Sequence, residues 1–247
     1  MWTFFHKLAS PPHFYRLAAK MIPWFAIAAL LLVGYGTVAG LFLAPPDYQQ
    51  GDAFRIIYVH VPSAYLSMMA YSVMAIAAGI GLIWRMKLAH SVAAAAAPIG
   101  AWFTFLALAT GSIWGRPMWG TWWEWGDPRM MSELVLLFLY FGYMALRSAI
   151  DDLAKADKAS AVLALVGAVN LPIIHFSVEW WTSLHQGPTL VRADGPAIAT
   201  DMLWPLLANI FGFTFFFGAV LLMRVRTEVL LRERRSGWVK RLLLETA

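Results

Sequence analysis

The sequence predicts an all-α polytopic membrane protein with six membrane-spanning helices. Of its 247 residues, 60% are hydrophobic and only 13% are charged, and the mean hydropathy is +0.63. This is far more apolar than the core of a soluble domain of the same length requires. Several apolar runs also approach or exceed the roughly 20 residues that a helix needs to cross a bilayer. We therefore expect one membrane domain over residues 1–247.

Six apolar runs are the expected spans, and they lie at residues 22–43, 58–83, 92–113, 132–146, 160–178 and 202–223. The first run begins after some twenty residues and is long enough to span, so we expect no cleaved leader and a retained first helix. Before it, Ser10-Pro11-Pro12 predicts the start of a short surface helix within an interfacial segment 1–21. The alanine run 93–97 in the third span predicts tight helix packing.

Lysine and arginine set the orientation of the bundle, because they resist transfer to the outer side of a membrane. With both termini in the cytoplasm, every Lys and Arg falls on the inner side except Arg55, Arg116, Arg129 and Arg192. The basic tail 224–247 is then cytoplasmic, and this topology accounts for the net charge of +5 without a nucleic-acid partner. Membrane lipid is the expected surrounding partner. The loop between the third and fourth spans faces outward.

This outer loop, residues 114–131, has the most unusual composition in the chain. Its glycines and prolines predict an irregular segment along the membrane surface. One or two tryptophans would fit the aromatic belt found at membrane interfaces. Five so close together favour a binding platform, because indole faces stack on flat ligands at about 0.5–1.5 kcal/mol per contact beyond the buried area. These five, of the thirteen in the chain, are Trp114, Trp119, Trp122, Trp123 and Trp125.

Two histidines are expected at the level of this loop. His60 opens the second span, where Pro62 suits the first turn of a helix, and His185 lies between the fifth and sixth spans. A porphyrin iron accepts an axial imidazole on each face. Two outer histidines beside a tryptophan platform therefore favour a haem site with His60 and His185 as iron ligands. On spacing alone, His175 in the fifth span is an alternative for the second position.

Haem propionates need cations or backbone donors, and outer cations are few. Arg55, shortly before His60, and Arg129, at the end of the tryptophan loop, are the candidates, with a solvent or lipid-phosphate contact as the alternative for each. Asp127 is expected to orient Arg129 or an indole N–H. Glu133 is interpreted as a charge near a helix N-terminus.

Two absences narrow the chemistry further. The chain has no cysteine, which excludes disulfides, thiolate metal sites and covalent haem attachment through Cys-x-x-Cys-His. It also has no glycine-rich loop of the kind that cradles phosphates, so we expect no ATPase activity and no enzyme.

The segment from Trp119 to Leu134 resembles the WWD signature of haem-handling membrane proteins, whose pattern is W-G-x-x-W-x-W-D-x-R-L-T. The stretches 58–62 and 180–186, together with the six-span length, are similar to the CcmC family of cytochrome c maturation proteins over nearly the whole chain. Two positions depart from the pattern. Gly126 is an extra residue before Asp127, and Met131 replaces the usual Thr. We expect the flexible Gly126 to absorb the shift of Asp127 and Arg129.

The resemblance implies a function, a location and partners. It implies a protein of the bacterial inner membrane that binds haem b transiently at its periplasmic face and delivers it to the haem chaperone CcmE for c-type cytochrome biogenesis. The implied partners are the ABC transporter subunits CcmA and CcmB and the small membrane subunit CcmD. The resemblance also favours His60 and His185 as the axial pair and makes His175 structural.

Three other classes of protein remain as alternatives. A b-type cytochrome subunit would pass electrons through a permanently held haem, although such haems usually lie between spans. A membrane enzyme acting on lipid-linked substrates would use Glu124, Asp127 and Glu179 as acid, base or metal ligands. A permease would move haem through the bundle, although the expected spans contain few of the ionisable groups that mark such pathways.

Overall fold

A computed structural model of the chain describes residues 10–187, 190 and 194–246, and Arg192 lies outside this part. The described residues form helices without strands. Six stretches are long and apolar enough to span a membrane, which confirms the predicted all-α class. The helices are α2 (Pro11–Val38), the π-helix η1 (Ala39–Leu43), the 3-10 helix η2 (Asp52–Ile56), α3 (Ile57–Trp84), α4 (Lys87–Trp119), α5 (Pro128–Ser148), α6 (Leu153–Gly167), α7 (Asn170–Trp180), α8 (Thr200–Arg232) and α9 (Gly237–Thr246).

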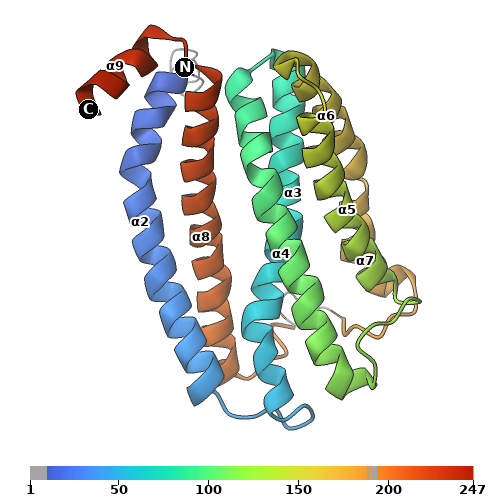
Figure 1. The fold of residues 1–247 in the computed structure, drawn as a ribbon. Coiled ribbons are helices and arrows are strands. Elements are labelled where there is room, and N and C mark those ends of the chain that lie inside the picture. The colour runs from blue at the N-terminus through green and yellow to red at the C-terminus, as the bar shows by residue number, and fades with distance from the viewer. Residues whose placement is uncertain (1–9, 188–189, 191–193, 247) are drawn as a thin grey trace.

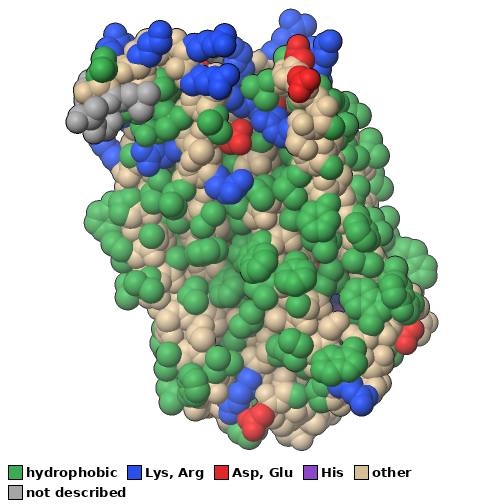
Figure 2. Space-filling view, in the orientation of Figure 1, with side chains coloured by type: hydrophobic (Ala, Val, Ile, Leu, Met, Phe, Trp, Pro, Cys, Tyr) green, Lys and Arg blue, Asp and Glu red, His purple; other side chains and the backbone are tan. Residues whose placement is uncertain are grey.

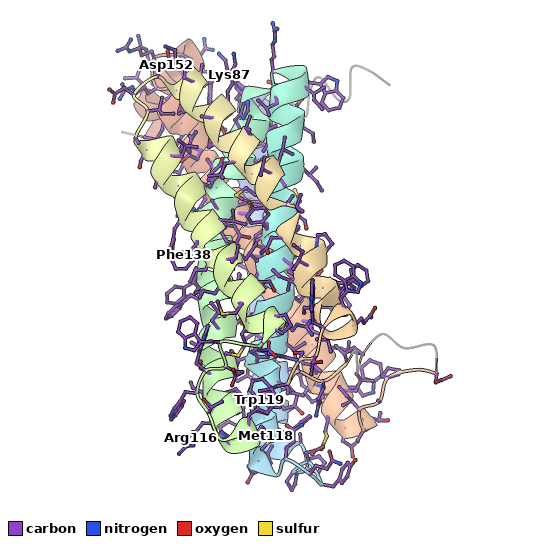
Figure 3. The ribbon with its side chains drawn as sticks, turned by 90° about the vertical axis from the view of Figure 1, so that its right-hand side faces the viewer. Lys87, Arg116, Met118, Trp119, Phe138 and Asp152 are labelled. Atoms are coloured by element: carbon purple, nitrogen blue, oxygen red, sulfur yellow. The ribbon has the colours of Figure 1, made fainter. Side chains whose placement is uncertain are left out.

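The helices form one elongated bundle with two different ends (Figure 1). Helices α2 and α8 pair along one side, α3 and α4 pack together beside them, and α5, α6 and α7 complete the other side. Both ends of the described chain lie at one end of the bundle, which we call the basic end because Lys and Arg side chains gather there (Figure 2). The opposite end, the tryptophan end, carries Arg116, Met118 and Trp119, whereas Lys87 and Asp152 lie at the basic end (Figure 3).

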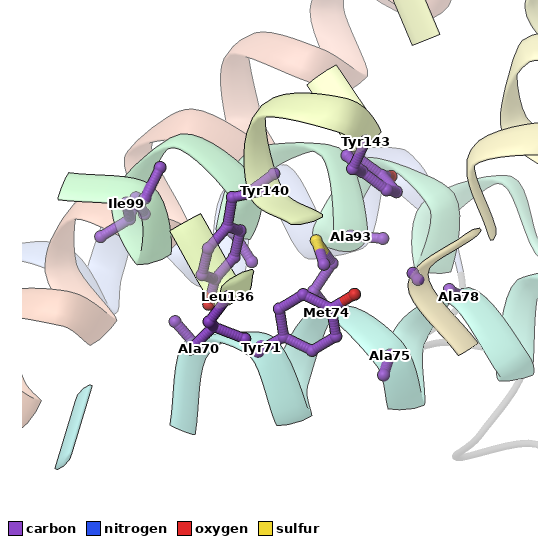
Figure 4. Packing of buried hydrophobic residues seen from close by; sticks show 14 of the residues in the cluster. Ala70, Tyr71, Met74, Ala75, Ala78, Ala93, Ile99, Leu136, Tyr140 and Tyr143 are labelled. Atoms are coloured by element: carbon purple, nitrogen blue, oxygen red, sulfur yellow. The ribbon is translucent and has the colours of Figure 1, made fainter. Parts of the chain in front are cut away.

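The main core lies between α3, α4, α5 and α6 (Figure 4). The Tyr140 hydroxyl donates to the carbonyl of Ser67 at 2.8 Å, and its ring packs edge-on against Tyr71 at 5.0 Å. Gly100 of α4 permits this packing, because a Cβ there would lie 2.1 Å from Tyr140. Within the run 93–97, four of the five alanines are fully buried and the fifth nearly so, as the prediction of tight packing requires.

The α2–α8 pair approaches closely for the same reason. A Cβ on Gly36 would lie 2.7 Å from the side chain of Asn209, and one on Gly212 would lie 2.8 Å from the backbone nitrogen of Val33. Small residues at a helix interface let the two backbones come together, and van der Waals packing then stabilises the pair within a membrane.

A buried ion cluster fastens helices α5, α6 and α8 together near the basic end. Asp157 of α6 accepts hydrogen bonds from Arg147 of α5 and from Arg232 of α8, the latter at 2.7 and 2.8 Å. Arg147 also reaches Glu228 at 3.4 Å. Buried charges are tolerated when they are paired in this way, so the cluster connects the α2–α8 pair with the other helices.

Both chain ends differ from the expected segmentation. Residues 11–21 do not form a separate surface helix; they are the first turns of α2, which continues through Pro23. Pro11 and Pro12 suit the first turn because its amides have no partner inside the helix, and neighbouring helices let spans tolerate an internal proline. At the other end, the described part of the predicted tail 224–247, residues 224–246, consists of the last turns of α8, a short turn and α9.

The tryptophan loop is shorter than expected. Helix α4 continues through Gly115 and Pro117 to Trp119, and α5 begins at Pro128 rather than near 132. The irregular segment is therefore residues 120–127. A spanning helix keeps its backbone bonded into the interface despite glycine and proline. Helix α4 ends at Gly120, whose φ of 78° favours glycine and whose N–H donates to the Arg116 carbonyl at 3.1 Å.

Candidate functional site

Asp127 is the centre of the polar contacts at the tryptophan end. It is the N-cap of α5, where Oδ1 accepts the Met130 N–H at 2.9 Å. Its Oδ2 accepts the Ser183 hydroxyl at 2.7 Å and the Leu184 N–H at 2.9 Å, and Oδ1 lies 3.1 Å from Nδ1 of His185. One carboxylate therefore fixes the start of α5 and the 181–187 loop relative to each other.

The charge of Asp127 is stabilised in place. Burial alone would raise the pKa of its carboxyl, but the hydrogen bonds from His185, Ser183 and the Met130 N–H outweigh burial and hold the pKa of Asp127 well below its usual range. Asp127 is thus an anion that accepts and does not donate. Nδ1 of His185 carries a proton towards it, and Nε2 is left with a free lone pair.

His60 has the same arrangement on the facing side. Its Nδ1 lies 3.1 Å from the Ala107 carbonyl and 3.0 Å from Thr110 Oγ1, both on α4. A carbonyl can only accept, so Nδ1 is the protonated nitrogen and Nε2 is free. His60 was expected at the outer mouth of the second span, and it lies in the first turn of α3, half-buried, with η2 preceding it.

Two tryptophans of α4, Trp114 and Trp119, lie near the two histidines. Trp114 lies on the face of α4 that also carries Ala107 and Thr110, since these positions are three, four or seven residues apart. Trp119 packs edge-on against Trp114 at 5.0 Å and against the His185 ring at 4.9 Å. Trp114 is held by a 3.0 Å hydrogen bond from its indole N–H to Gln50. His60 and His185 lie close enough for their charges to interact.

Arg129 and Glu133 are the ionisable groups behind this site. Arg129 is half-buried and interacts electrostatically with Asp127, Glu133 and His60, and no hydrogen bond to its guanidinium is found among the described residues. Glu133 was expected to be a simple helix-terminal charge. It is instead 7% exposed and one of its oxygens has no hydrogen-bond partner in the described part of the chain. It lies one turn along α5 from Arg129, with which it interacts electrostatically.

The structure brings together only some of the predicted site residues. Trp123 packs edge-on against Trp125 at 5.7 Å, and Trp122 and Trp125 are largely exposed. No ring contact between these three and the histidines occurs in the described residues. Arg55 binds Asp52 at 2.9 Å and the Gly40 carbonyl at 3.0 Å, so much of its bonding capacity is used in joining η1 to η2.

The other predicted or alternative residues lie apart from this site. His175 is exposed on α7 and touches Phe176 rather than Asp127 or Trp119. Among the described residues, no cluster of three or more His, Asp or Glu is arranged to hold a metal ion. Glu124 accepts the Gly126 N–H at 3.0 Å and Glu179 is exposed. The enzyme alternative gains no support from this arrangement.

Sequence reasoning missed the residues that hold the histidines. Ser183 lies between Asp127 and His185. Its hydroxyl donates to Asp127 and accepts the backbone N–H of His185 at 3.1 Å. Its position two residues before a candidate ligand was a signal that could have been used. Thr110 and the Ala107 carbonyl gave no such signal, because their role depends only on how α3 packs against α4.

The arrangement holds two imidazoles at one end of the bundle, each with Nδ1 hydrogen-bonded, together with the indoles of Trp114 and Trp119 and the guanidinium of Arg129. Imidazole pairs of this kind suit an iron porphyrin, whose propionates need a cation. The buried indole N–H of Trp123 also has no acceptor among the described residues, which provides a further donor. The residues present therefore fit haem.

The chain is similar to known proteins over nearly its whole length. The sequence model of the CcmC family, described as "Heme exporter protein C", matches residues 4–240. The chain belongs to the CcmC family. The protein named "Heme exporter protein C" from Escherichia coli (strain K12) is 52% identical over 246 residues, covering 99% of this chain and 98% of its own length. Its namesakes are 51% identical in Haemophilus influenzae, with 98% of each chain covered, and 42% identical in Paracoccus denitrificans, with 93% of this chain and 94% of the relative covered.

Within this CcmC family member, the extra Gly126 does not displace Asp127 from a useful position. The Asp127 N–H donates to the Glu124 carbonyl at 3.2 Å, so Gly126 lies inside a tight turn. This turn positions Asp127 where it caps α5 and contacts His185. Met131, the second departure from the signature, follows in the first turn of α5 and makes an ordinary helical bond to the Asp127 carbonyl at 3.1 Å.

Proposed function

We propose that this protein binds haem at the tryptophan end and delivers it to the chaperone CcmE for c-type cytochrome biogenesis. The observation that carries the proposal is the pair of anchored imidazoles, with Asp127 behind His185 and the Ala107 carbonyl behind His60. Membership of the CcmC family, whose relatives are named haem exporter protein C, supports it.

Each site residue has a role in this proposal. His60 and His185 ligate the iron from opposite faces, and Asp127 keeps His185 in the ligating tautomer. Trp114 and Trp119 line the porphyrin, while Arg129 and the Trp123 N–H bind propionates. Arg55 is a second propionate partner through the donors that it does not use for Asp52 and Gly40.

The surface that meets the chaperone is the exposed pair Trp122 and Trp125. Both indoles are more than half exposed and lie in the 120–127 loop, beside the bound porphyrin rather than beneath it. Aromatic side chains at such positions commonly anchor protein–protein contacts. In this proposal the helical bundle holds the haem on one side, and the chaperone CcmE approaches it from the periplasmic side.

The proposed setting is the bacterial inner membrane, with the tryptophan end in the periplasm. The partners are the ABC transporter subunits CcmA and CcmB and the small membrane subunit CcmD. The chain has no phosphate-binding glycine loop of its own, which agrees with ATP hydrolysis by a separate subunit. Haem b is the cargo and is bound transiently.

The ligand assignment is tested by absorption spectroscopy of the purified protein with haem. We expect a low-spin, bis-imidazole spectrum that is lost or strongly weakened in His60→Ala and in His185→Ala. His175→Ala is the matched control, and its equilibrium spectrum should equal that of the wild type. Unaltered spectra in both ligand variants would remove the assignment.

Delivery is tested by adding a soluble chaperone domain with an acceptor histidine. Haem should move to the chaperone, faster in the presence of the transporter and ATP, and Trp119→Ala or Trp123→Ala should reduce chaperone loading while the protein still folds in the membrane. A haem that stays through repeated reduction and oxidation and cannot be removed by an acceptor would identify an electron-transfer subunit instead.

A further inference from the structure

A groove opens on the outer surface of the bundle between α3 and α7, away from the paired imidazoles. Its cavity volume is about 490 Å³, within the range of pockets that hold small molecules. Because α3 and α7 both belong to membrane-spanning stretches, the groove faces the bilayer. Its lining residues include Tyr65, Met68 and Met69 from α3 and Leu171, His175 and Phe176 from α7.

His175 is the feature that lipid alone does not explain. Its side chain is exposed, and among the described residues it makes an edge-on ring contact with Phe176 at 4.7 Å but no hydrogen bond. An imidazole that faces acyl chains without a partner loses its hydration and gains nothing in return. Polar and ionisable groups in such positions usually serve a ligand or a transport path.

The groove leads towards the histidine site along both of its walls. At a rise of 1.5 Å per residue, Tyr65 lies about 7–8 Å inward of His60 on α3, and His175 lies about 7–8 Å inward of Trp180 on α7. Phe176 stacks on Trp180 at 5.2 Å, and Trp180 contacts Trp181 at 5.7 Å. An aromatic line thus runs from the groove to the start of the loop that carries His185.

The lining chemistry selects among possible occupants. Apolar walls and two thioether side chains suit any apolar ligand, and an acyl chain would fill them while leaving His175 unpaired. A planar metalloporphyrin suits the apolar walls and His175 together, because its ring contacts the walls and its metal binds the imidazole. The groove is therefore matched to a haem dissolved in the bilayer.

We propose that this groove takes haem laterally from the bilayer, with His175 as a transitory iron ligand, and passes it to His60 and His185. The inference rests on the proposed function of the tryptophan end. In the transfer, the bond from iron to His175 breaks and one of the two histidines, His60 or His185, takes that axial position. The other histidine takes the second axial position, which is open or releases a water, and no electron is gained or lost.

The test measures how fast haem enters from lipid. Purified protein in nanodiscs is mixed with phosphatidylcholine vesicles containing haem, and the rise of the bis-imidazole spectrum is followed. We expect His175→Leu to load about tenfold more slowly or worse, the loss corresponding to one removed ligand interaction, and to reach the same final spectrum. His13→Leu is the matched control, since His13 is an exposed imidazole near the start of α2 at the basic end, and it should load at the wild-type rate.

A second variant keeps the test decisive. Met68→Trp places a larger side chain in the groove while keeping the His175 imidazole, and it should slow loading from vesicles as well. Equal rates for the wild type, His175→Leu and Met68→Trp would overturn the lateral groove and leave the haem site intact. A wild-type protein that forms no bis-imidazole spectrum would instead overturn the proposed function, and the groove with it.

Discussion

At the scale of single residues, the site depends on how two imidazoles are held rather than on the imidazoles alone. His185 is oriented by a carboxylate and His60 by a backbone carbonyl, and both leave Nε2 free. A hydrogen-bonded partner behind a ligating histidine fixes its tautomer and raises its basicity. Residues behind the ligands are therefore expected to change haem capture without contacting haem.

Asp127→Asn tests this expectation. Asn also caps helices well, so the variant should still fold, although without the stability that the ionised carboxylate adds. Without the carboxylate charge behind His185, its affinity for haem should fall by about 10–100-fold. A haem titration of purified protein measures the loss. Asp152→Asn is the matched control, because Asp152 caps α6 by accepting the Lys155 N–H at 2.9 Å and has no histidine beside it. A loss of the same size in both variants would contradict the role given to Asp127.

The depressed pKa of Asp127 predicts how stability depends on pH. The folded pKa lies below the ordinary value of about 3.9, so the contribution of Asp127 to stability is present above that value and is lost as the pH falls through the folded pKa. Lowering the pH from about 5 to about 3 should therefore reduce the thermal unfolding temperature of the wild type in detergent. The reduction should be steeper than in Asp127→Asn, which has no carboxyl to protonate at that position. Parallel curves would show that Asp127 adds nothing to acid sensitivity.

At the scale of elements, the end of α4 decides where the tryptophan loop begins. Gly120 has a φ of 78°, which costs a residue with a side chain about 1–2 kcal/mol. Gly120→Ala should lower the free energy of unfolding by about that amount and displace the 120–127 loop, weakening haem binding as well. Gly187→Ala is the control, since Gly187 has neither a positive φ nor a neighbour within 4 Å of a new Cβ. Thermal unfolding and a haem titration measure both effects, and equal behaviour of the two variants would contradict the argument.

The elements show which parts of the structure were predictable from sequence. The six spans were, because long apolar runs have few other uses, and so was the position of His60 and His185 at the same end of the bundle. The continuation of α4 through Pro117 was not, because a membrane tolerates helix breakers that would end a helix in water. The contact of the Ala107 carbonyl with His60 could not be predicted either, since every residue has a backbone carbonyl and the sequence does not show which one accepts.

At the scale of the whole molecule, the buried cluster at Asp157 holds α8, and with it α2, against the other helices. Removing the Asp157 carboxylate leaves Arg147 and Arg232 with Glu228, which is 25% exposed, as the remaining acid of the cluster. Breaking a buried ion pair typically costs about 3–5 kcal/mol. Asp157→Asn should therefore lower the thermal stability of the purified protein strongly. Asp151→Asn, an exposed acid in the neighbouring turn, should not. A small effect at Asp157 would mean that helix packing alone holds the bundle together.

The distribution of charge over the whole bundle predicts its orientation. Lys and Arg gather at the end that holds both termini of the described chain (Figure 2), and such residues stay on the cytoplasmic side. The described positive residues expected on the outer side are Arg55, Arg116 and Arg129. Arg55 and Arg116 each bond to a nearby carbonyl, and Arg129 interacts with two acids, so their charges are partly accommodated by local contacts.

Alkaline phosphatase fusions test this orientation, because the enzyme is active only after export. Fusions after Trp125 and after Gln186, in the two loops that form the proposed haem site, should be active. Fusions after Lys87, Asp152 and Arg235, at the basic end, should be inactive and serve as matched controls of similar length. The opposite pattern would place the tryptophans in the cytoplasm, where a periplasmic chaperone could not reach the haem, and delivery as proposed would then be ruled out even if His60 and His185 bind iron.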